Sequence, residues 1–352
     1  MSTHARQLNS EAMQQTNKDI GLEELDGFQL PREVTEDFLT RMQAQSQILG
    51  MADTMTLDRL EQSVPKFGVP RLSGNARGEE ESRTDASDAE SGDVRFNVTD
   101  QSYYILYEPK RDALKNTHPG VNNFGELIMN EFVERWANDV AIIGIRANAS
   151  DGNLDDLAGR SDLDDTWDGW IAIAEGEDTE SDRIGLEDTD DTEVDTMPTY
   201  DHADDEGTPQ PVDTGMFNSA IQMLDARYRD PDEVVFLVSP DVVQQYHYNL
   251  TEREDGLGVA VLQGDNDVTP FDYDVIGIPE WPNEYGMFTS PDNLAFGIFE
   301  EMELDQTTDT DKVHEQRLHS RNWLEGQFDF QIKELQAGVL VTGIEDPNLN
   351  GT

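Results

Sequence analysis

The sequence contains no cysteine among its 352 residues, which excludes disulfide bonds and zinc sites that use cysteine ligands. It also lacks any apolar run of the roughly 18–20 residues that a membrane-spanning helix requires. The first ten residues are polar and have no apolar core segment, unlike a secretory signal. These absences predict a protein that is made and folded in a cytoplasm and has no membrane contact.

Basic residues are scarce: 24 lysines and arginines face 75 aspartates and glutamates, for a formal net charge of −51. This charge opposes folding in dilute buffer through self-repulsion, whereas molar salt shortens the Debye length to about 3 Å. We therefore expect a halophilic protein without a cofactor, whose acidic side chains hold only loosely bound counter-ions. Apolar residues make up 36% and recur in periodic blocks, which favours a folded protein over a disordered one. The shortage of lysine and arginine argues against sequence-specific contact with nucleic acid.

Catalytic motifs are also missing from the sequence. It has no phosphate-binding loop, no dinucleotide-binding glycine motif after a strand, and no H-E-x-x-H or G-x-S-x-G. His314 and His319 are five residues apart, which is not the spacing of two metal ligands on one helix face, and we expect His202 to be solvated. Acid pairs such as Asp164–Asp165 and Asp190–Asp191 follow from the composition. We assign no catalytic, cofactor-binding or metal-binding residue and expect a protein that is not an enzyme.

The N-terminal third combines a helix with an extended hairpin. A helix is predicted to begin at Pro31, because its apolar residues fall on one face: Val34, Phe38, Met42 and Leu49. This helix packs either on its own domain or on a neighbouring subunit, and the sequence leaves the two about equal. Residues 64–75 and 94–108 are predicted to be extended, and the polar residues 76–93 between them form a solvated tip.

A long amphipathic helix is predicted over residues 121–146. Apolar residues recur in steps of four along it: Phe124, Ile128, Phe132, Trp136 and Val140. The following stretch, 151–213, is acidic and predicted to be mostly loop. Within it lies an apolar island that is expected to return to the core: Trp167, Trp170, Ile171 and Ile173.

The C-terminal part mixes helices and strands without a repeated strand–helix order. An amphipathic helix is predicted over 215–228, with Phe217, Ile221, Leu224 and Tyr228 facing inward. A buried strand at 234–239 leads into a second helix, since Ser239 is a favourable N-cap and Pro240 a favourable first helical residue. Further strands are predicted at 273–278, 294–304, 328–335 and 338–344. This order predicts an α+β fold.

Six stretches in this order resemble the major capsid proteins of tailed viruses with the Hong Kong 97 fold, in particular the branch typified by enterobacterial P-two-like phages. They are LPREVTEDFLTRMQAQSQILGMADTMTLD at 30–58, the helix at 121–146, DTWDGWIAIAEG at 165–176, YRDPDEVVFLVSPDVVQQYHYNL at 228–250, GIPEWPNEYGMFTSPDNLAFGIFEEME at 277–303 and FDFQIKELQAGVLVTGI at 328–344. The fourth is the most specific, with Asp-Pro followed by a buried strand and a helix. The resemblance covers most of the chain.

The resemblance implies the division of the chain into parts. These are an N-terminal arm at 1–63, an extended E-loop hairpin at 64–112, a peripheral domain with a spine helix at 113–150 and 305–352, and an axial domain at 151–304. The acidic segment 177–211 is an insertion in the axial domain. The loop from Trp281 to Tyr285 would approach the axis of a ring of subunits.

The resemblance also implies the function. The protein would assemble with itself into pentamers and hexamers of an icosahedral shell that encloses viral DNA, in a virus of a halophilic archaeon. Candidate partners are scaffold, portal and decoration proteins, and the protein would reside in the virion capsid after assembly in the host cytoplasm. One alternative is an encapsulin-like nanocompartment shell with protein cargo, and another is a halophilic enzyme of unknown class.

Overall fold

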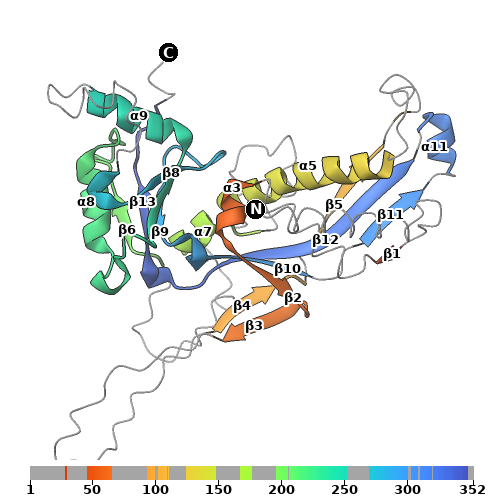
Figure 1. The fold of residues 1–352 in the computed structure, drawn as a ribbon, viewed down its shortest axis with the longest axis horizontal. Helices are drawn as coiled ribbons and strands as arrows, with labels where there is room; N and C mark the ends of the chain where they lie inside the picture. The colour runs from red at the N-terminus through yellow and green to blue at the C-terminus, as the bar shows by residue number, and fades with distance from the viewer. Residues whose placement is uncertain are drawn as a thin grey trace, which may run out of the picture.

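The computed structural model describes residues 28–29, 46–65, 93–99, 102–108, 110, 124–147, 167–176, 196–204, 206–251, 269–299, 303–307, 310–318 and 320–347. Figure 1 shows an elongated molecule in which these residues form two large sheets side by side and a separate two-stranded sheet. The longer sheet extends beneath one long helix at one end of the molecule, and the smaller sheet lies at the opposite end. Helices and strands mix as the α+β prediction expects.

The longer sheet is organised around β12, Arg321–Ile332. This strand pairs antiparallel with β11 (Glu303–Thr307) and β5 (Ser102–Tyr107) along its first half, and with β10 (Leu294–Phe299) along its second half. Burial alternates along the first half of β12, whereas residues 328–332 are all buried. The second half is therefore covered on both faces.

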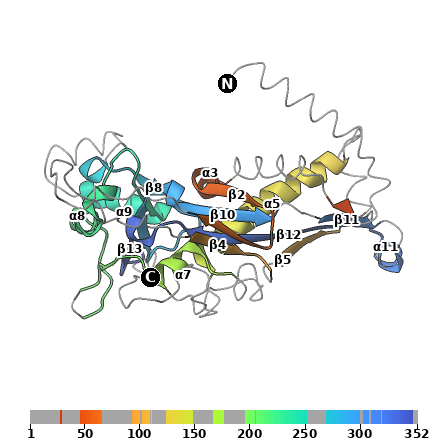
Figure 2. The ribbon, with the colours of Figure 1, turned by 90° about the horizontal axis from the view of Figure 1, so that it is seen from below.

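Three strands from the N-terminal part lie at edges of the longer sheet, and β5 is one of them. β1 (Phe28–Gln29) pairs with β11, and β2 (Asp53–Leu57) runs parallel to β10. The helix α5 (Phe124–Arg146) lies along one face of the sheet (Figures 1 and 2). It confirms the predicted long helix, and the stripe residues Trp136 and Val140 are fully buried. The side chains of Phe124, Ile128 and Phe132 lie outside the described part.

The smaller sheet has the strand order β6 (Thr199–Asp201), β13 (Gly338–Thr342), β9 (Gly286–Thr289), β7 (Val235–Val238) and β8 (Val275–Gly277). Two helices, α8 (Thr214–Met223) and α9 (Pro240–Thr251), pack on it. The helices are neighbours, because the rings of Phe217 and Tyr246 are 4.8 Å apart. Both rings belong to a second core cluster together with Phe236 and Phe288 of the sheet.

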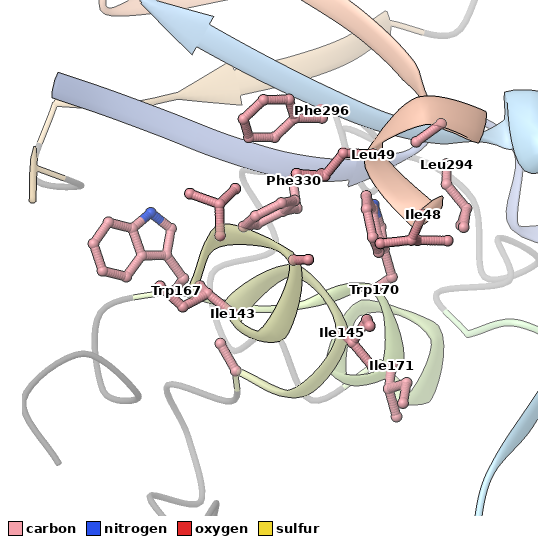
Figure 3. Packing of buried hydrophobic residues seen from close by; sticks show 14 of the residues in the cluster. Ile48, Leu49, Ile143, Ile145, Trp167, Trp170, Ile171, Leu294, Phe296 and Phe330 are labelled. Atoms are coloured by element: carbon pink, nitrogen blue, oxygen red, sulfur yellow. The ribbon is translucent and has the colours of Figure 1, made fainter. Parts of the chain in front are cut away.

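The main core lies where the two sheets meet. The short helix α7 (Trp170–Glu175) packs against both α5 and β12, and Trp170 is fully buried beside Phe330, as Figure 3 shows. The indole N–H groups of Trp167 and Trp170 donate to the carbonyls of Phe328 at 2.9 Å and Ala295 at 3.2 Å. The predicted return of this apolar island to the core is confirmed, although part of it is helical and not loop.

From strand to strand the chain passes between the sheets three times, and Asn293 holds the last two crossings together. One crossing runs from β9 to β10 through η3 (Pro291–Asn293), and the other runs from β12 to β13 through η4 (Leu335–Ala337). The Asn293 side chain accepts from the Glu334 N–H and donates to the Glu334 carbonyl, each at 2.9 Å. This pair of hydrogen bonds fixes the two sheets relative to each other.

The predicted domain boundaries do not coincide with the sheets. β13 comes from the segment 305–352 that was expected in the peripheral domain, yet it pairs within the smaller sheet. β10 comes from 151–304, the expected axial domain, yet it pairs with β12 of the longer sheet. The reason is the pair of crossings. The first places β10 in the longer sheet after β9, and the second places β13 in the smaller sheet after β12.

Several element predictions also need correction. The predicted strand at 294–304 is two strands, β10 and β11, which pair with different halves of β12. The predicted loop 151–213 contains α7 and β6, because β6 gains hydrogen bonds by pairing parallel to β13. The helix predicted at 215–228 ends at Met223, and Ala226–Tyr228 form a 3-10 turn, η1, instead. Four strands were not predicted at all: β1, β2, β6 and β9.

The predicted arm is in part an element of the chain's own fold. Ile48 and Leu49 of α3 (Gln47–Met51) are buried in the main core, and β2 follows in the longer sheet. For residues 46–57 the structure therefore supports docking on the chain's own domain. The helix start at Pro31 and the residues Val34, Phe38 and Met42 lie outside the described residues.

Candidate assembly surfaces

The side chains considered as ligands do not come together. His314 is exposed on α11 (Asp311–Glu315), while His319 and both acid pairs, at 164–165 and 190–191, lie outside the described residues. His202 is half-buried and not fully solvated as predicted, because its Nε2 lies 3.0 Å from the carbonyl oxygen of Pro211. In the part of the chain that the structure describes, no group of three or more histidines and carboxylates is close enough to hold a metal ion, and no helix is long and apolar enough to cross a membrane.

The most apolar exposed strand is β5, whose sequence SYYILY carries no charge. Tyr104 is 59% exposed, and Leu106 and Tyr107 are also exposed. Within the described residues β5 pairs only with β12, so no described strand lies along its other edge. Edge strands in soluble proteins usually carry charges or proline that discourage further pairing. The uncharged β5 lacks these features and is a candidate contact surface.

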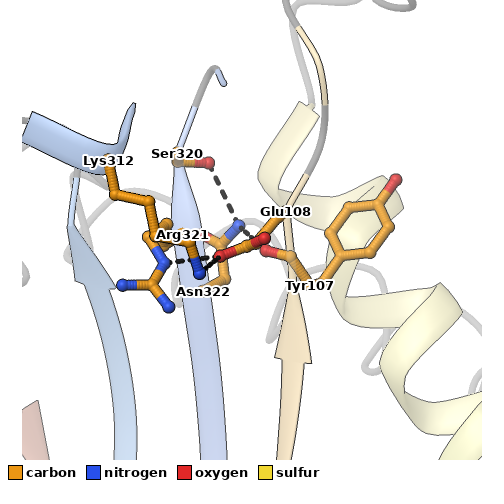
Figure 4. Close-up of polar contacts among 6 residues, drawn as sticks. All are labelled: Tyr107, Glu108, Lys312, Ser320, Arg321 and Asn322. Atoms are coloured by element: carbon orange, nitrogen blue, oxygen red, sulfur yellow. Dashed lines mark hydrogen bonds and ion pairs between the residues drawn. The ribbon is translucent and has the colours of Figure 1, made fainter. Parts of the chain in front are cut away.

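A cluster of charges fixes the end of this strand, as Figure 4 shows. The carboxylate of Glu108 accepts from Nε of Arg321 at 2.6 Å and lies 3.1 Å from Nζ of Lys312. These two cations, Lys312 first, hold the pKa of Glu108 below its ordinary value. Asn322 adds a hydrogen bond from its amide to the carbonyl of Tyr107 at 3.3 Å. The cluster ties together three elements, β5, β12 and α11, at the far end of the longer sheet.

The inward face of β5 is held by aromatic packing. The Tyr103 ring stacks on Trp136 of α5 and lies against Phe328 of β12, with both ring centroids 4.9 Å away. Opposite Tyr103 in the sheet is Gly326, where a Cβ would overlap the tyrosine hydroxyl oxygen. Burial raises the pKa of the Tyr103 hydroxyl well above its usual value. The exposed tyrosines of β5 are therefore presented from a rigid base.

The second candidate surface is the hairpin of β3 (Glu61–Pro65) and β4 (Asp93–Asn97), which pair antiparallel. Figure 1 shows it projecting from the face of the longer sheet. The pairing agrees in part with the predicted extended hairpin, because β4 covers only the start of the predicted strand 94–108 and β5 pairs with β12 instead. Of the tip predicted at 76–93, residues 76–92 lie outside the described residues. Its base is a small core of its own, in which Phe96 sits over Gly297 so closely that a Cβ there would lie 2.6 Å from the ring.

A buried carboxylate also anchors the hairpin. Asp329 of β12 has no exposed surface, and its Oδ2 accepts from the backbone N–H of Asn97 at 3.0 Å. Its Oδ1 accepts from the N–H of Phe330 at 2.9 Å. Asp329 was not predicted as an anchor, although the sequence carries a signal for it. In the segment FDFQI the acid Asp329 stands between two phenylalanines of an apolar strand. A buried carboxylate needs hydrogen-bond partners, so an acid at this position indicates a contact.

The loop from Trp281 to Tyr285 is held by the main core and by the end of α5. The Trp281 side chain is buried in the main core, and its indole N–H donates to the carbonyl of Tyr285 at 3.0 Å. Next to it, Arg146 at the end of α5 donates from Nε to the carbonyl of Glu280 at 2.6 Å. The indole therefore does not point outward. The expected approach of this loop to an axis of subunits stays a prediction.

The described geometry is shared with chains of viral and virus-like shells. A chain of the satellite phage P4 procapsid, solved with its size determination (Sid) protein, matches with a TM-score of 0.62 and 14% identity over 98% of each chain. The capsid of the native GTA particle gives 0.55 and 10% identity, over 86% of this chain and 91% of that chain. The capsid of cyanophage A-1(L) gives 0.54 and 12% identity, over 86% and 93%. No family model and no curated protein matches the sequence.

At these identities the comparisons establish the fold. The chain has the mixed α+β, Hong Kong 97-type fold of phage capsid chains. The predicted fold class is thereby confirmed at this level. The matched chains come from capsids and a procapsid.

Proposed function

We propose that the protein is the major capsid protein of a tailed virus and assembles into pentamers and hexamers of an icosahedral shell around viral DNA. The observation that carries this proposal is the likeness of the whole chain to a procapsid chain, over 98% of both, with a TM-score of 0.62. A match of this extent leaves no large part of either chain for a separate activity. The function is then the assembly itself.

Two surfaces support contact between subunits. The β3–β4 hairpin projects from the body while its base is fixed by Asp329 and by its own small core. The edge of β5 presents Tyr104 and Leu106 without any charge. Stable assemblies of this kind bury on the order of 2,000 Å² or more per interface, which an exchanged hairpin and an open strand edge can supply together.

The charge supports adaptation to molar salt, in a virus of a halophilic archaeon. Each subunit carries a formal charge of −51, so a closed shell brings many strongly negative surfaces together. Repulsion of this size opposes closure in dilute buffer and is screened at molar salt. The same charge means that the wall confines the DNA without gripping it through phosphate contacts. Scaffold, portal and decoration proteins are proposed as further partners, with assembly in the host cytoplasm and residence in the virion.

The test is electron microscopy of the chain expressed alone in molar salt and then dialysed to low salt. Closed shells, rings or tubes that come apart on dialysis are the expected result. A monodisperse small species at every salt and protein concentration would contradict self-assembly of the chain alone. Where particles form in a halophilic host, nuclease-protected DNA inside them supports the capsid, whereas a protein cargo without DNA would favour the nanocompartment alternative.

A further inference from the structure

A short segment follows β13 beside the smaller sheet, residues 343–347, which we call the strap. The N–H of Gln210 donates to the carbonyl of Gly343 at 3.0 Å, and the N–H of Glu345 donates back to the carbonyl of Gln210 at 2.9 Å. Between these two bonds the side chain of Ile344 is fully buried in the second core cluster. The first half of the strap is therefore attached to the loop after β6 by backbone hydrogen bonds and to the core by apolar packing.

The strap also holds the loop from Trp281 to Tyr285 through two contacts. The N–H of Ile344 donates to the carbonyl of Glu284 at 3.3 Å. The side-chain amide of Asn283 donates to a carboxylate oxygen of Asp346 at 2.8 Å, and both side chains are half-buried. The backbone contact fixes where the loop lies, and the side-chain contact fixes which way its amide group points.

Asn283 passes this orientation on to the start of α9. Its amide oxygen accepts from the hydroxyl of Ser239 at 2.5 Å, and the same hydroxyl oxygen accepts from the N–H of Val242 at 3.1 Å. A carboxylate can only accept hydrogen bonds, so Asp346 requires the NH2 group of Asn283 on its side and leaves the amide oxygen for Ser239. The single proton of the serine hydroxyl is thereby directed to Asn283, and its lone pairs remain for the helix cap.

We infer that the strap is a conformational latch: when closed it sets the loop from Trp281 to Tyr285 and the cap of α9 together, and its opening releases both. Ile344 is the fixed point, whereas residues 345–347 are only half-buried and can detach without unfolding the sheet. The inference concerns a single subunit and does not rest on the proposed shell function. For a shell protein it means that the loop has its shape before any neighbour is present.

The test exchanges donor and acceptor between Asn283 and Asp346. Asn283→Asp alone removes the donor and places two carboxylates face to face, so the strap should open. Adding Asp346→Asn restores one donor and one acceptor in reversed order, and this swapped variant keeps the wild-type net charge. The new carboxylate at position 283 can accept both from the amide at position 346 and from the hydroxyl of Ser239. The swapped variant should therefore close the strap again.

Hydrogen exchange of the unassembled chain in molar salt, followed by mass spectrometry, measures the opening. We expect Asn283→Asp to speed exchange about tenfold in two peptides, 278–286 and 240–246, and the swapped variant to return both to within about threefold of the wild type. Exchange in β12, 321–332, should stay unchanged in every variant. The matched control is Asn218→Asp on α8, which adds the same charge and still accepts from the amide of Gln222, and it should exchange like the wild type.

Three results would overturn the latch: wild-type exchange in Asn283→Asp, faster exchange in the loop without faster exchange at the start of α9, or a swapped variant that exchanges as fast as Asn283→Asp. If Asn283→Asp does not fold, Asp346→Ala is compared with Asp274→Ala, a change at an exposed aspartate just before β8. The latch then requires faster exchange in the same two peptides for Asp346→Ala alone. Shell formation is scored separately by electron microscopy, so failure of the proposed function leaves this result unaffected.

Discussion

The carboxylate of Asp329 on β12 accepts a hydrogen bond at 3.0 Å from the backbone N–H of Asn97 on β4, although the two residues are 232 positions apart. This contact joins the base of the projecting hairpin to the central strand of the longer sheet. Asp329 is fully buried, and it also accepts from the N–H of Phe330. The direction of the hairpin is therefore set within one subunit, before any neighbour is present.

Replacing Asp329 by asparagine should loosen the hairpin. The amide keeps one acceptor oxygen but turns an NH2 group toward backbone donors, so at least one buried N–H loses its partner. We expect a loss of about 1–3 kcal/mol in the free energy of unfolding, and faster hydrogen exchange in residues 93–97. Denaturant unfolding in molar salt measures the first and mass spectrometry the second. Asp292→Asn, at an exposed position, is the control, and equal effects of the two changes would contradict the anchoring role.

Gly326 and Tyr103 should behave as a coupled pair. Gly326→Ala places a methyl group against the tyrosine hydroxyl, and overpacking of this kind costs about 1–3 kcal/mol. Tyr103→Phe should be nearly neutral, since the buried hydroxyl has no hydrogen-bond partner among the described residues. The double variant should recover part of the stability that Gly326→Ala loses, as measured by thermal unfolding. Strictly additive effects would mean that the two side chains do not meet.

Glu108 should give a small, pH-dependent contribution to stability. Lys312 and Arg321 lower its pKa in the folded protein, so the folded state favours the charged carboxylate. The stabilisation is complete above the ordinary pKa of a glutamate and disappears as the pH falls through the lowered value. We expect Glu108→Gln to cost less than about 1 kcal/mol at neutral pH, because the pair is partly solvated and screened by salt. The difference between variant and wild type should vanish in unfolding curves recorded at acid pH, and a constant difference would contradict this origin.

Dilution from molar to low salt should destabilise the subunit itself as well as the assembly. The formal charge of −51 repels itself more strongly as the Debye length grows from about 3 Å at 1 M to about 10 Å at 0.1 M. Four tryptophans, at 136, 167, 170 and 281, are buried in the main core, so loss of packing will appear in near-ultraviolet circular dichroism and in fluorescence. Unchanged spectra and unfolding temperature at low salt would show that the acidic surface is not a salt adaptation.

The spacing of apolar residues and the helix-capping residues predicted much of the local structure. The four-residue spacing through Trp136 and Val140 predicted α5, and Ser239 before Pro240 predicted the start of α9, where the Ser239 hydroxyl accepts from the Val242 N–H at 3.1 Å. Short strands were harder to predict, because β9 and β2 gain their hydrogen bonds from partners far along the chain. β9 pairs with β7 and β13, and β2 with β10, so nothing within a local window indicates them.

The candidate surfaces also combine features that the sequence shows with features that only the fold decides. That β5 is an uncharged strand can be seen in SYYILY, but its exposure depends on its place at the edge of the sheet. Local composition says what a surface carries, and the fold determines whether it is a surface.

By itself the sequence determined the charge, the α+β class, the long helix and the absence of any recognisable catalytic motif. Those properties follow from composition and from periodicities of two and about four residues, which are local. Only the tertiary structure decided how strands separated by hundreds of residues pair, how Asn293 joins the two crossings, and why Asp329 is buried beneath the hairpin. These depend on contacts between distant segments, whose free energy appears only when the whole chain packs.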